Sequence, residues 1–320
     1  MDNIFVEPLP VWKNMLHKLF FINHASMREP RDFADIVVER PLSLEVYAKA
    51  RNFFEDPDNI INPLDFKGYG GFDQRGIEND IQKIIAKLAR IAQRETVNEK
   101  EIARCASVFE ALFADLAELN NWVGESTMVG TASKYDDLFN GVDVVMEMVD
   151  TRINMSVPLA IDVTSSEQSI VEKLGRIKDS IDSSELTRID YFRPVAEGTN
   201  LQQGRLSCVA KCVVAVDRET IAELGDLWIK KDKASYAKLA NHPIQHQILE
   251  QLSLQLGAFL KYARSRSGSQ KTSMALANAL ERVQTVKKSK SGGAITDPMT
   301  QTMRRDLVGL FEPQVYKQAA

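Results

Sequence analysis

Two aspartates lie in short segments that alternate as strands do. Asp143 lies in GVDVVMEMV (141–149), and Asp162 lies in PLAIDVT (158–164). Both segments place an apolar residue at every second position, which is the period of a β-strand. A carboxylate buried in a strand is costly unless it is paired or bound to a metal ion. Two such carboxylates on neighbouring strands could share Mg²⁺, which prefers oxygen ligands and often binds one or two carboxylates together with a substrate phosphate.

A third acid can be chosen from a predicted helix that precedes these strands. Apolar residues recur at helical spacing from Ile102 to Leu119, and Asn98 and Glu101 have the spacing of a capping box. On a helical wheel Glu110 flanks the apolar face, whereas Glu118 points to solvent. Glu110 is therefore the preferred partner for the two strand aspartates.

These acids need a sheet and helices to position them. From Asn98 to Val216 the patterns predict a helix, a β-hairpin, a strand, a helix and a strand. The second helix begins near Ser165, and a short additional strand is predicted at 188–192. We therefore expect an α/β core at 96–217, with helical regions before and after it.

At these residues the chain resembles the restriction-endonuclease-like, or PD-(D/E)XK, nuclease superfamily. The resemblance covers residues 96–217 and depends on the element order and on two short motifs. The motifs are Tyr135-Asp136-Asp137 leading into Gly141-Val142-Asp143, and Ile161-Asp162-Val163-Thr164 entering a helix. The resemblance implies a restriction-endonuclease-like fold and Mg²⁺-dependent hydrolysis of phosphodiester bonds in nucleic acid, with DNA as the expected substrate.

The same resemblance assigns roles to residues. Asp143 and Asp162 would bind Mg²⁺, and Glu110 would complete the metal site. The family's lysine position is occupied by Thr164, which cannot supply positive charge to a transition state. Some members of the superfamily carry the lysine on the following helix, where Lys173 is the first candidate and Lys178 the second.

Thr164 also supports an alternative hypothesis. A member of the same fold that has lost catalysis would act as a nucleic-acid-binding or scaffold protein. A third hypothesis is a helical interaction protein in which the strands play no functional part. The two aspartates would then be solvated residues, or partners of Arg and Lys side chains.

Positive charge is concentrated near the C-terminus. Between residues 255 and 292 there are eight lysines and arginines and one acid, although the whole chain has a net charge of −4. Such a stretch is either a solvated helix face or a contact surface for phosphates. The residues predicted to bind nucleic acid are Arg264, Arg266, Lys271, Lys287, Lys288 and Lys290.

Length and composition limit the class of protein. The chain has 320 residues, of which 44% are hydrophobic and 26% charged, as in globular proteins of about two domains. Three cysteines argue against a disulfide framework, and no run approaches the ~18 apolar residues of a membrane span. The first residues lack the pattern of a secretory signal. We therefore expect a cytoplasmic protein that does not enter a membrane.

The patterns divide the chain into four parts. Residues 1–95 are predicted to be mostly helical, with helices at 11–21, 43–54 and 77–93. The nuclease-like core at 96–217 follows, and residues 218–288 are predicted to be helical again. Residues 289–320 are predicted to be a flexible tail that contains one short amphipathic piece.

Overall fold

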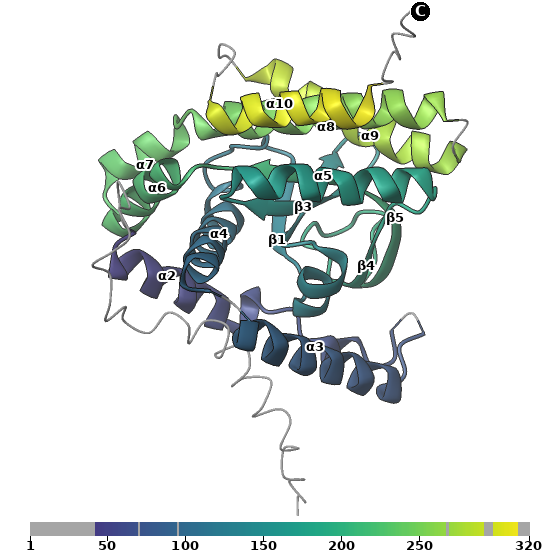
Figure 1. Cartoon of the computed structure of the whole chain (residues 1–320), viewed down its shortest axis with the longest axis horizontal. Helices are drawn as coiled ribbons and strands as arrows, with labels where there is room; N and C mark the ends of the chain where they lie inside the picture. The colour runs from purple at the N-terminus through teal and green to yellow at the C-terminus, as the bar shows by residue number, and fades with distance from the viewer. Residues whose placement is uncertain (1–41, 70, 95, 267–268, 291–296, 313–320) are drawn as a thin grey trace, which may run out of the picture.

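A five-stranded mixed sheet lies at the centre of the protein. The computed structural model describes residues 42–69, 71–94, 96–266, 269–290 and 297–312 (Figure 1). The strands are β1 (Thr127–Thr131), β2 (Val144–Asp150), β3 (Met155–Thr164), β4 (Thr187–Phe192) and β5 (Gly204–Ala215). They lie in the order β1-β2-β3-β5-β4, in which only β3 and β5 run parallel. The predicted α/β class is confirmed, and the two segments of period two form β2 and β3.

Two helices belong to the predicted core. α4 spans Val97–Leu116 and α5 spans Glu167–Asp182. α4 begins with a capping box in which the Glu99 N–H donates to Thr96 Oγ1 at 3.3 Å and the Thr96 N–H donates to Glu99 Oε2 at 2.8 Å. The predicted capping box at Asn98 and Glu101 is therefore wrong, because the helix begins two residues earlier.

Further helices precede and follow the core in the sequence. The N-terminal ones are α2 (Leu44–Glu55) and α3 (Gln74–Arg94), joined through η1 (Pro57–Asn59) and η2 (Pro63–Phe66). After the sheet come α6 (Arg218–Lys230), α7 (Lys233–Ala240), α8 (Ile244–Ser265), α9 (Gln270–Ser289) and α10 (Pro298–Phe311). The helix predicted at 11–21 lies outside the described residues. None of the described helices is long and apolar enough to cross a membrane.

The expected flexible tail contains a packed helix. α10 begins at an Asp297 cap and buries Met303 and Leu307 against α5 and α8. Residues 298–311 are therefore not the flexible tail that was expected, because their apolar side chains pack against α5 and α8.

A layer of helices covers one face of the sheet, and a second, separate layer packs near β4. α4, α5, α8 and α9 contact the strands and bury the face that carries Val144 and Ile161. Figure 1 shows α3 on the other side of the molecule, together with the short π-helical segment η3 (Asp136–Asn140). The acids of interest lie where β2 and β3 approach this second layer.

Candidate active site

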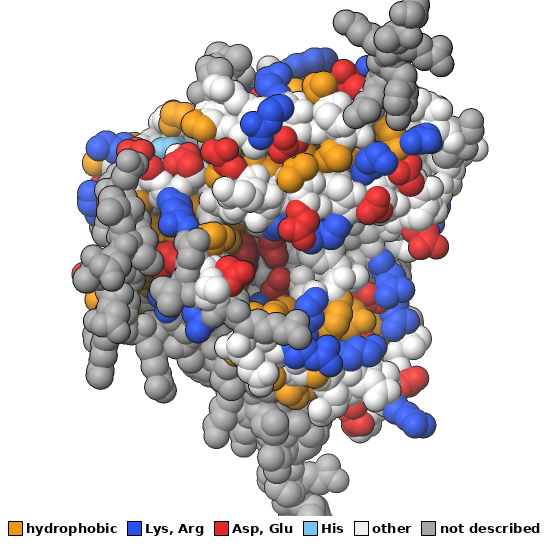
Figure 2. Space-filling view, in the orientation of Figure 1, with side chains coloured by type: hydrophobic (Ala, Val, Ile, Leu, Met, Phe, Trp, Pro, Cys, Tyr) orange, Lys and Arg blue, Asp and Glu red, His pale blue; other side chains and the backbone are white. Residues whose placement is uncertain are grey.

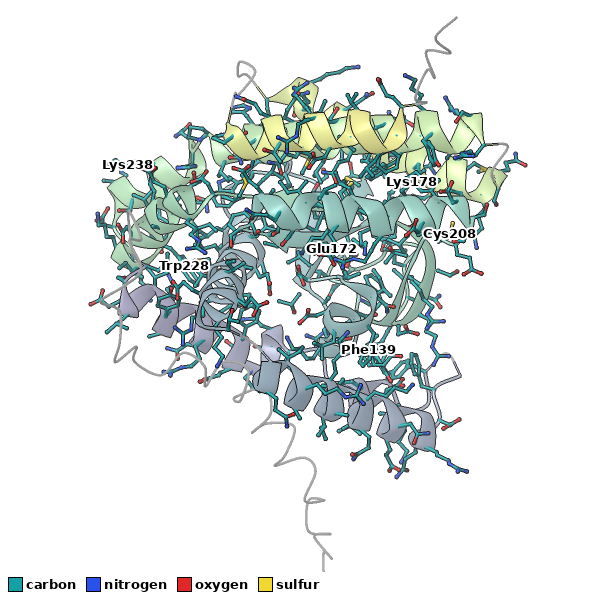
Figure 3. All side chains as sticks on the ribbon, in the orientation of Figure 1. Phe139, Glu172, Lys178, Cys208, Trp228 and Lys238 are labelled. Atoms are coloured by element: carbon teal, nitrogen blue, oxygen red, sulfur yellow. The ribbon has the colours of Figure 1, made fainter. Side chains whose placement is uncertain are left out.

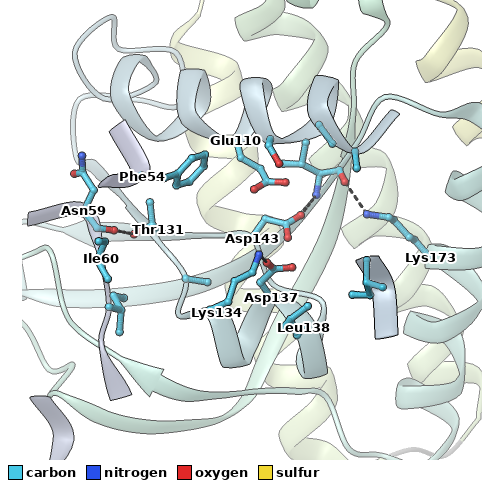
Figure 4. A pocket seen from close by; sticks show the side chains of 17 residues that line it. Phe54, Asn59, Ile60, Glu110, Thr131, Lys134, Asp137, Leu138, Asp143 and Lys173 are labelled. Carbon is cyan, nitrogen blue, oxygen red and sulfur yellow. Dashed lines mark hydrogen bonds and ion pairs between the residues drawn. The ribbon is translucent and has the colours of Figure 1, made fainter. Parts of the chain in front are cut away.

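A cavity of about 280 Å³ lies between α4, the start of β2 and η3. Figure 2 shows acidic side chains at the bottom of a hollow near the centre of the face in view. The charged residues that line the cavity are Glu110, Lys134, Asp137, Asp143 and Lys173 (Figure 4). Three of the four residues predicted to be catalytic, Glu110, Asp143 and Lys173, thus line the cavity.

Asp143 and Asp162 face each other where β2 and β3 begin to separate. The paired ladder ends at Val144 and Ile161, so that Asp143, just before Val144, and Asp162, just after Ile161, form the next opposed pair. The Asp143 N–H donates to the Ile161 carbonyl at 2.9 Å, and Asp143 Oδ2 accepts from the Val163 N–H at 2.7 Å. Opposed residues of an antiparallel pair share a face of the sheet. The Asp143 carboxylate therefore accepts a backbone hydrogen bond at the point where the regular strand pairing ends.

Lys173 connects α5 to the end of β3. Its Nζ donates to Asp162 Oδ1 and, at 2.6 Å, to the Val163 carbonyl. Burial opposes the charge of Lys173, but Asp162 and Asp143 outweigh burial and raise the pKa of its ammonium group. This lysine was predicted for its place on the helix after β3, and it lies beside Asp162 and close enough to Asp143 to feel its charge.

The alternative lysine and the threonine at the family's lysine position have other contacts. Lys178 donates to Asp182 at 2.8 Å and lies farther along α5, as Figure 3 shows. Thr164 is buried, and its Oγ1 accepts from the Ser166 N–H at 3.1 Å. Thr164 therefore shapes the turn between β3 and α5 and is not among the residues that line the cavity.

Glu110 points from α4 toward Asp143 (Figure 4). Burial, followed by the neighbouring Asp137 carboxylate, raises the pKa of Glu110 to about 7. The pKa of Asp143 is also raised well above its usual value, by burial and then by Glu110 and Asp162. Glu118 is exposed and its Oε2 accepts from the Val129 N–H at 3.4 Å, so Glu110 is the acid that belongs to the site.

Lys211 on β5 is a member of the site that sequence reasoning missed. This lysine is buried, its Nζ donates to the Asn140 carbonyl at 3.1 Å, and it lies 4.0 Å from Asp162 Oδ2. Burial lowers the pKa of Lys211, although Asp162 opposes that shift. The available signal was a lysine inside the otherwise apolar run CVAKCVVAV (208–216), where a charge requires a partner.

The donor atoms fit Mg²⁺ in their chemistry. Glu110, Asp143 and Asp162 supply the carboxylate oxygens that this cation prefers, and their mutual repulsion would be relieved by a divalent charge. In the described part of the chain, however, no three acidic, histidine or cysteine side chains form a ready metal-binding group. A metal ion would have to compete with Lys173 for Asp162.

The basic stretch near the C-terminus does not reach this cavity. Among its predicted nucleic-acid contacts, Lys287 forms an ion pair with Glu250 and Arg266 donates to the Tyr262 hydroxyl at 2.9 Å. Lys290 donates to Gln245 Oε1 at 3.0 Å and to the Asn121 carbonyl. The exposed members of the set are Arg264, Arg266, Lys271 and Lys288. The structure therefore does not bring this stretch together with the acidic site.

Comparisons with protein-family models, with curated proteins and with solved structures find no match to this chain.

Proposed function

We propose that this protein is a Mg²⁺-dependent nuclease of the restriction-endonuclease-like class, which hydrolyses phosphodiester bonds in DNA. One observation carries the proposal. Three of the four residues predicted from the sequence line one cavity, and the fourth, Asp162, accepts a hydrogen bond from Lys173 beside it. The four residues are Glu110, Asp143, Asp162 and Lys173.

The order of elements supports the same class. α4 is followed by the antiparallel strands β1, β2 and β3, then by α5, and then by β5 parallel to β3. The edge strand β4 is added between α5 and β5 in sequence. This order agrees with the helix, hairpin, strand, helix and strand that the resemblance implies.

Each side chain has a role that follows from its surroundings. Asp143 and Asp162 would hold Mg²⁺, which supplies Lewis-acid activation of water and charge neutralisation when bound. Glu110, which points toward Asp143, would complete the metal site. Lys173 and Lys211 place two ammonium groups next to Asp162, where they would offset the charge of the phosphate.

The ion pair between Lys173 and Asp162 favours a second candidate function. If that pair persists when Mg²⁺ is present, Asp162 Oδ1 is not free to bind the metal ion. The protein would then be a catalytically inactive member of the class that binds nucleic acid or acts as a scaffold.

A cleavage assay with Asp162→Asn tests the proposal. The wild-type protein should cleave single- or double-stranded DNA with Mg²⁺ or Mn²⁺, and chelation should stop the reaction. Asp162→Asn should lower the rate at least ~100-fold, because a neutral amide is a poor ligand for a hard cation. Lys173→Ala should lower the rate by roughly 10²–10³, the usual effect of losing a group that stabilises transition-state charge.

Matched substitutions on exposed surfaces serve as controls. Asp179→Asn on α5 and Lys238→Ala on α7 change the same residue types away from the cavity and should cleave at the wild-type rate. Wild-type protein that binds DNA but cleaves no substrate with either metal ion would refute the proposed activity and support the inactive alternative.

A further inference from the structure

A second basic surface lies next to the acidic cavity. Lys83, Lys87 and Arg90 follow one another at helical spacing on α3. Arg188 on β4 and Arg205 on β5 continue the positive charge, and both contact Asp190. Figure 2 shows lysine and arginine side chains gathered below the hollow, between α3 and the β4 edge. We call these five residues the α3 band.

Contacts with η3 place the band at the edge of the cavity. The Lys83 ammonium lies 5.9 Å from the centre of the Tyr135 ring, and Lys87 Nζ donates to the carbonyl of Leu138. Leu138 and Ile91, one residue after Arg90, both line the cavity. The band therefore runs along η3 and ends where the acidic site begins.

Most of the charge of the band is accessible. The side chains of Lys83, Arg188 and Arg205 are 56%, 58% and 48% exposed, although each has an acidic neighbour. Arg90 is also exposed. By contrast, Lys287 and Lys290 of the C-terminal basic stretch are held by Glu250 and Asn121. Exposed cations are the ones that can exchange their counterions for phosphates.

An exposed aromatic side chain stands among these cations. Phe139 of η3 is 40% exposed, and the Lys87 ammonium lies 4.6 Å from its ring centre. The Tyr135 ring supports Phe139 from inside, with 4.8 Å between the ring centres. Phe139 is labelled next to α3 in Figure 3. A supported aromatic ring beside a row of cations is typical of surfaces that stack unpaired bases.

We propose that the α3 band binds the backbone of a single-stranded nucleic acid, with one unpaired base stacked on Phe139, and leads the strand into the cavity. The choice of nucleic acid as the partner rests on the proposed nuclease function. The band replaces the C-terminal basic stretch as the expected binding surface, because it lies at the edge of the cavity, next to the acids that would act on the phosphate.

Binding measured without metal ions separates this proposal from catalysis. The affinity of the full-length protein for a labelled thymidine oligonucleotide would be measured in chelator at several salt concentrations. The triple variant Lys83→Gln, Lys87→Gln and Arg90→Gln should bind at least ~10-fold more weakly. Its slope of log affinity against log salt should be shallower by about 2, since each single-strand phosphate contact contributes about 0.7.

Two further triple variants remove the same amount of charge elsewhere. Lys287→Gln, Lys288→Gln and Lys290→Gln change the C-terminal basic stretch, and Lys230→Gln, Lys233→Gln and Lys238→Gln change exposed positions on and around α7. Both should bind with wild-type affinity and slope. Because Lys87 contacts η3, the double variant Lys83→Gln and Arg90→Gln provides a test that leaves that contact in place.

Phe139→Leu tests the stacked base. It should weaken binding of the single strand by roughly 5- to 100-fold, the range for loss of one base–aromatic stack, and leave binding of a matched duplex unchanged.

Wild-type affinity and slope in the band variants would overturn the proposal, as would a slope reduced only by the Lys287, Lys288 and Lys290 changes. Equal losses for single strand and duplex in Phe139→Leu would overturn the stacked base. Binding through the band without any cleavage would support the surface and refute the nuclease. Cleavage that is unaffected by the band changes would refute the surface alone.

Discussion

Gly141 controls the space between Asp162 and Lys211. Its φ is +61°, a conformation that costs a residue with a side chain roughly 1–2 kcal/mol. A Cβ atom at this position would lie 3.2 Å from Asp162 Oδ2 and 3.4 Å from Lys211 Nζ. Glycine therefore permits both the turn after η3 and the close approach of the two charged groups.

Gly141→Ala should affect both stability and the site. We expect the free energy of unfolding to fall by about 1–2 kcal/mol, measured by urea denaturation, because of the positive φ. Cleavage should fall as well, since the added methyl group displaces Asp162 or Lys211.

Gly175→Ala is the control. Gly175 lies inside α5, where an added Cβ meets nothing within 4 Å, so alanine should stabilise the protein by up to about 1 kcal/mol. If Gly141→Ala were as stable and as active as the wild type, the proposed tightness of this corner would be wrong.

At the scale of elements, glutamines from α8 bond to the buried edge of β5 that no strand pairs with. β4 pairs with β5 only as far as Val209, so the later residues of β5 lack a strand on that side. Gln255 accepts from the Val213 N–H at 2.7 Å and donates to its carbonyl at 2.7 Å, and Gln251 contacts the N–H and carbonyl of Ala215 in the same way. Side-chain amides thus satisfy buried backbone groups that would otherwise be costly.

His242 likewise bonds to a buried backbone group, at the start of α8. Its Nδ1 accepts from the Ile244 N–H at 3.1 Å, which is possible only while that nitrogen carries no proton. The spacing of His242 and His246 resembles a metal-binding pair in sequence, but the backbone bond already uses Nδ1 of His242. Burial lowers the pKa of His242, although Glu223 opposes that shift.

This depressed pKa predicts a loss of stability in acid. A histidine whose folded pKa lies below its unfolded value of about 6.5 binds more protons in the unfolded state, so stability is full above pH ~6.5 and falls as the pH drops through that value. His242→Asn keeps an acceptor for the Ile244 N–H but cannot titrate. Urea denaturation between pH 7.5 and 5 should give a shallower decline for this variant, and an identical decline would contradict the prediction.

At the scale of the whole molecule, the regions separated in the sequence share one hydrophobic core. Val46 of α2, Phe109 of α4, Ile161 of β3, Leu256 of α8 and Met303 of α10 belong to the same buried cluster. α2, α8 and α10, which lie outside residues 96–217 in the sequence, are therefore part of the scaffold that positions the acidic site.

Met303→Ala tests this shared core. Removing a fully buried methionine should lower the free energy of unfolding by about 2–5 kcal/mol, and a single transition should be retained in urea denaturation. Val308→Ala lies on the same helix at a position that is 54% exposed, and should change stability by no more than about 0.5 kcal/mol. An unchanged stability in Met303→Ala would mean that α10 is not docked in solution.

The sequence by itself determined the strand that carries Asp162, the strand that begins directly after Asp143, and the helices that carry Glu110 and Lys173. These elements follow from local backbone geometry, because the periods of two and 3.6 residues show in the order of apolar side chains. The choice of Glu110 over Glu118 also needed only the angle between neighbouring residues of one helix.

Only the tertiary structure decided which charges are partners. Lys211 joins Asp162 because β5 lies next to β3, and Lys287 is occupied because α8 brings Glu250 beside it. The placement of α3 beside η3, which creates the α3 band, likewise joins residues about 50 positions apart, such as Lys87 and Leu138. Such contacts depend on how distant elements pack, and the period of apolar residues within one element carries no information about its neighbours.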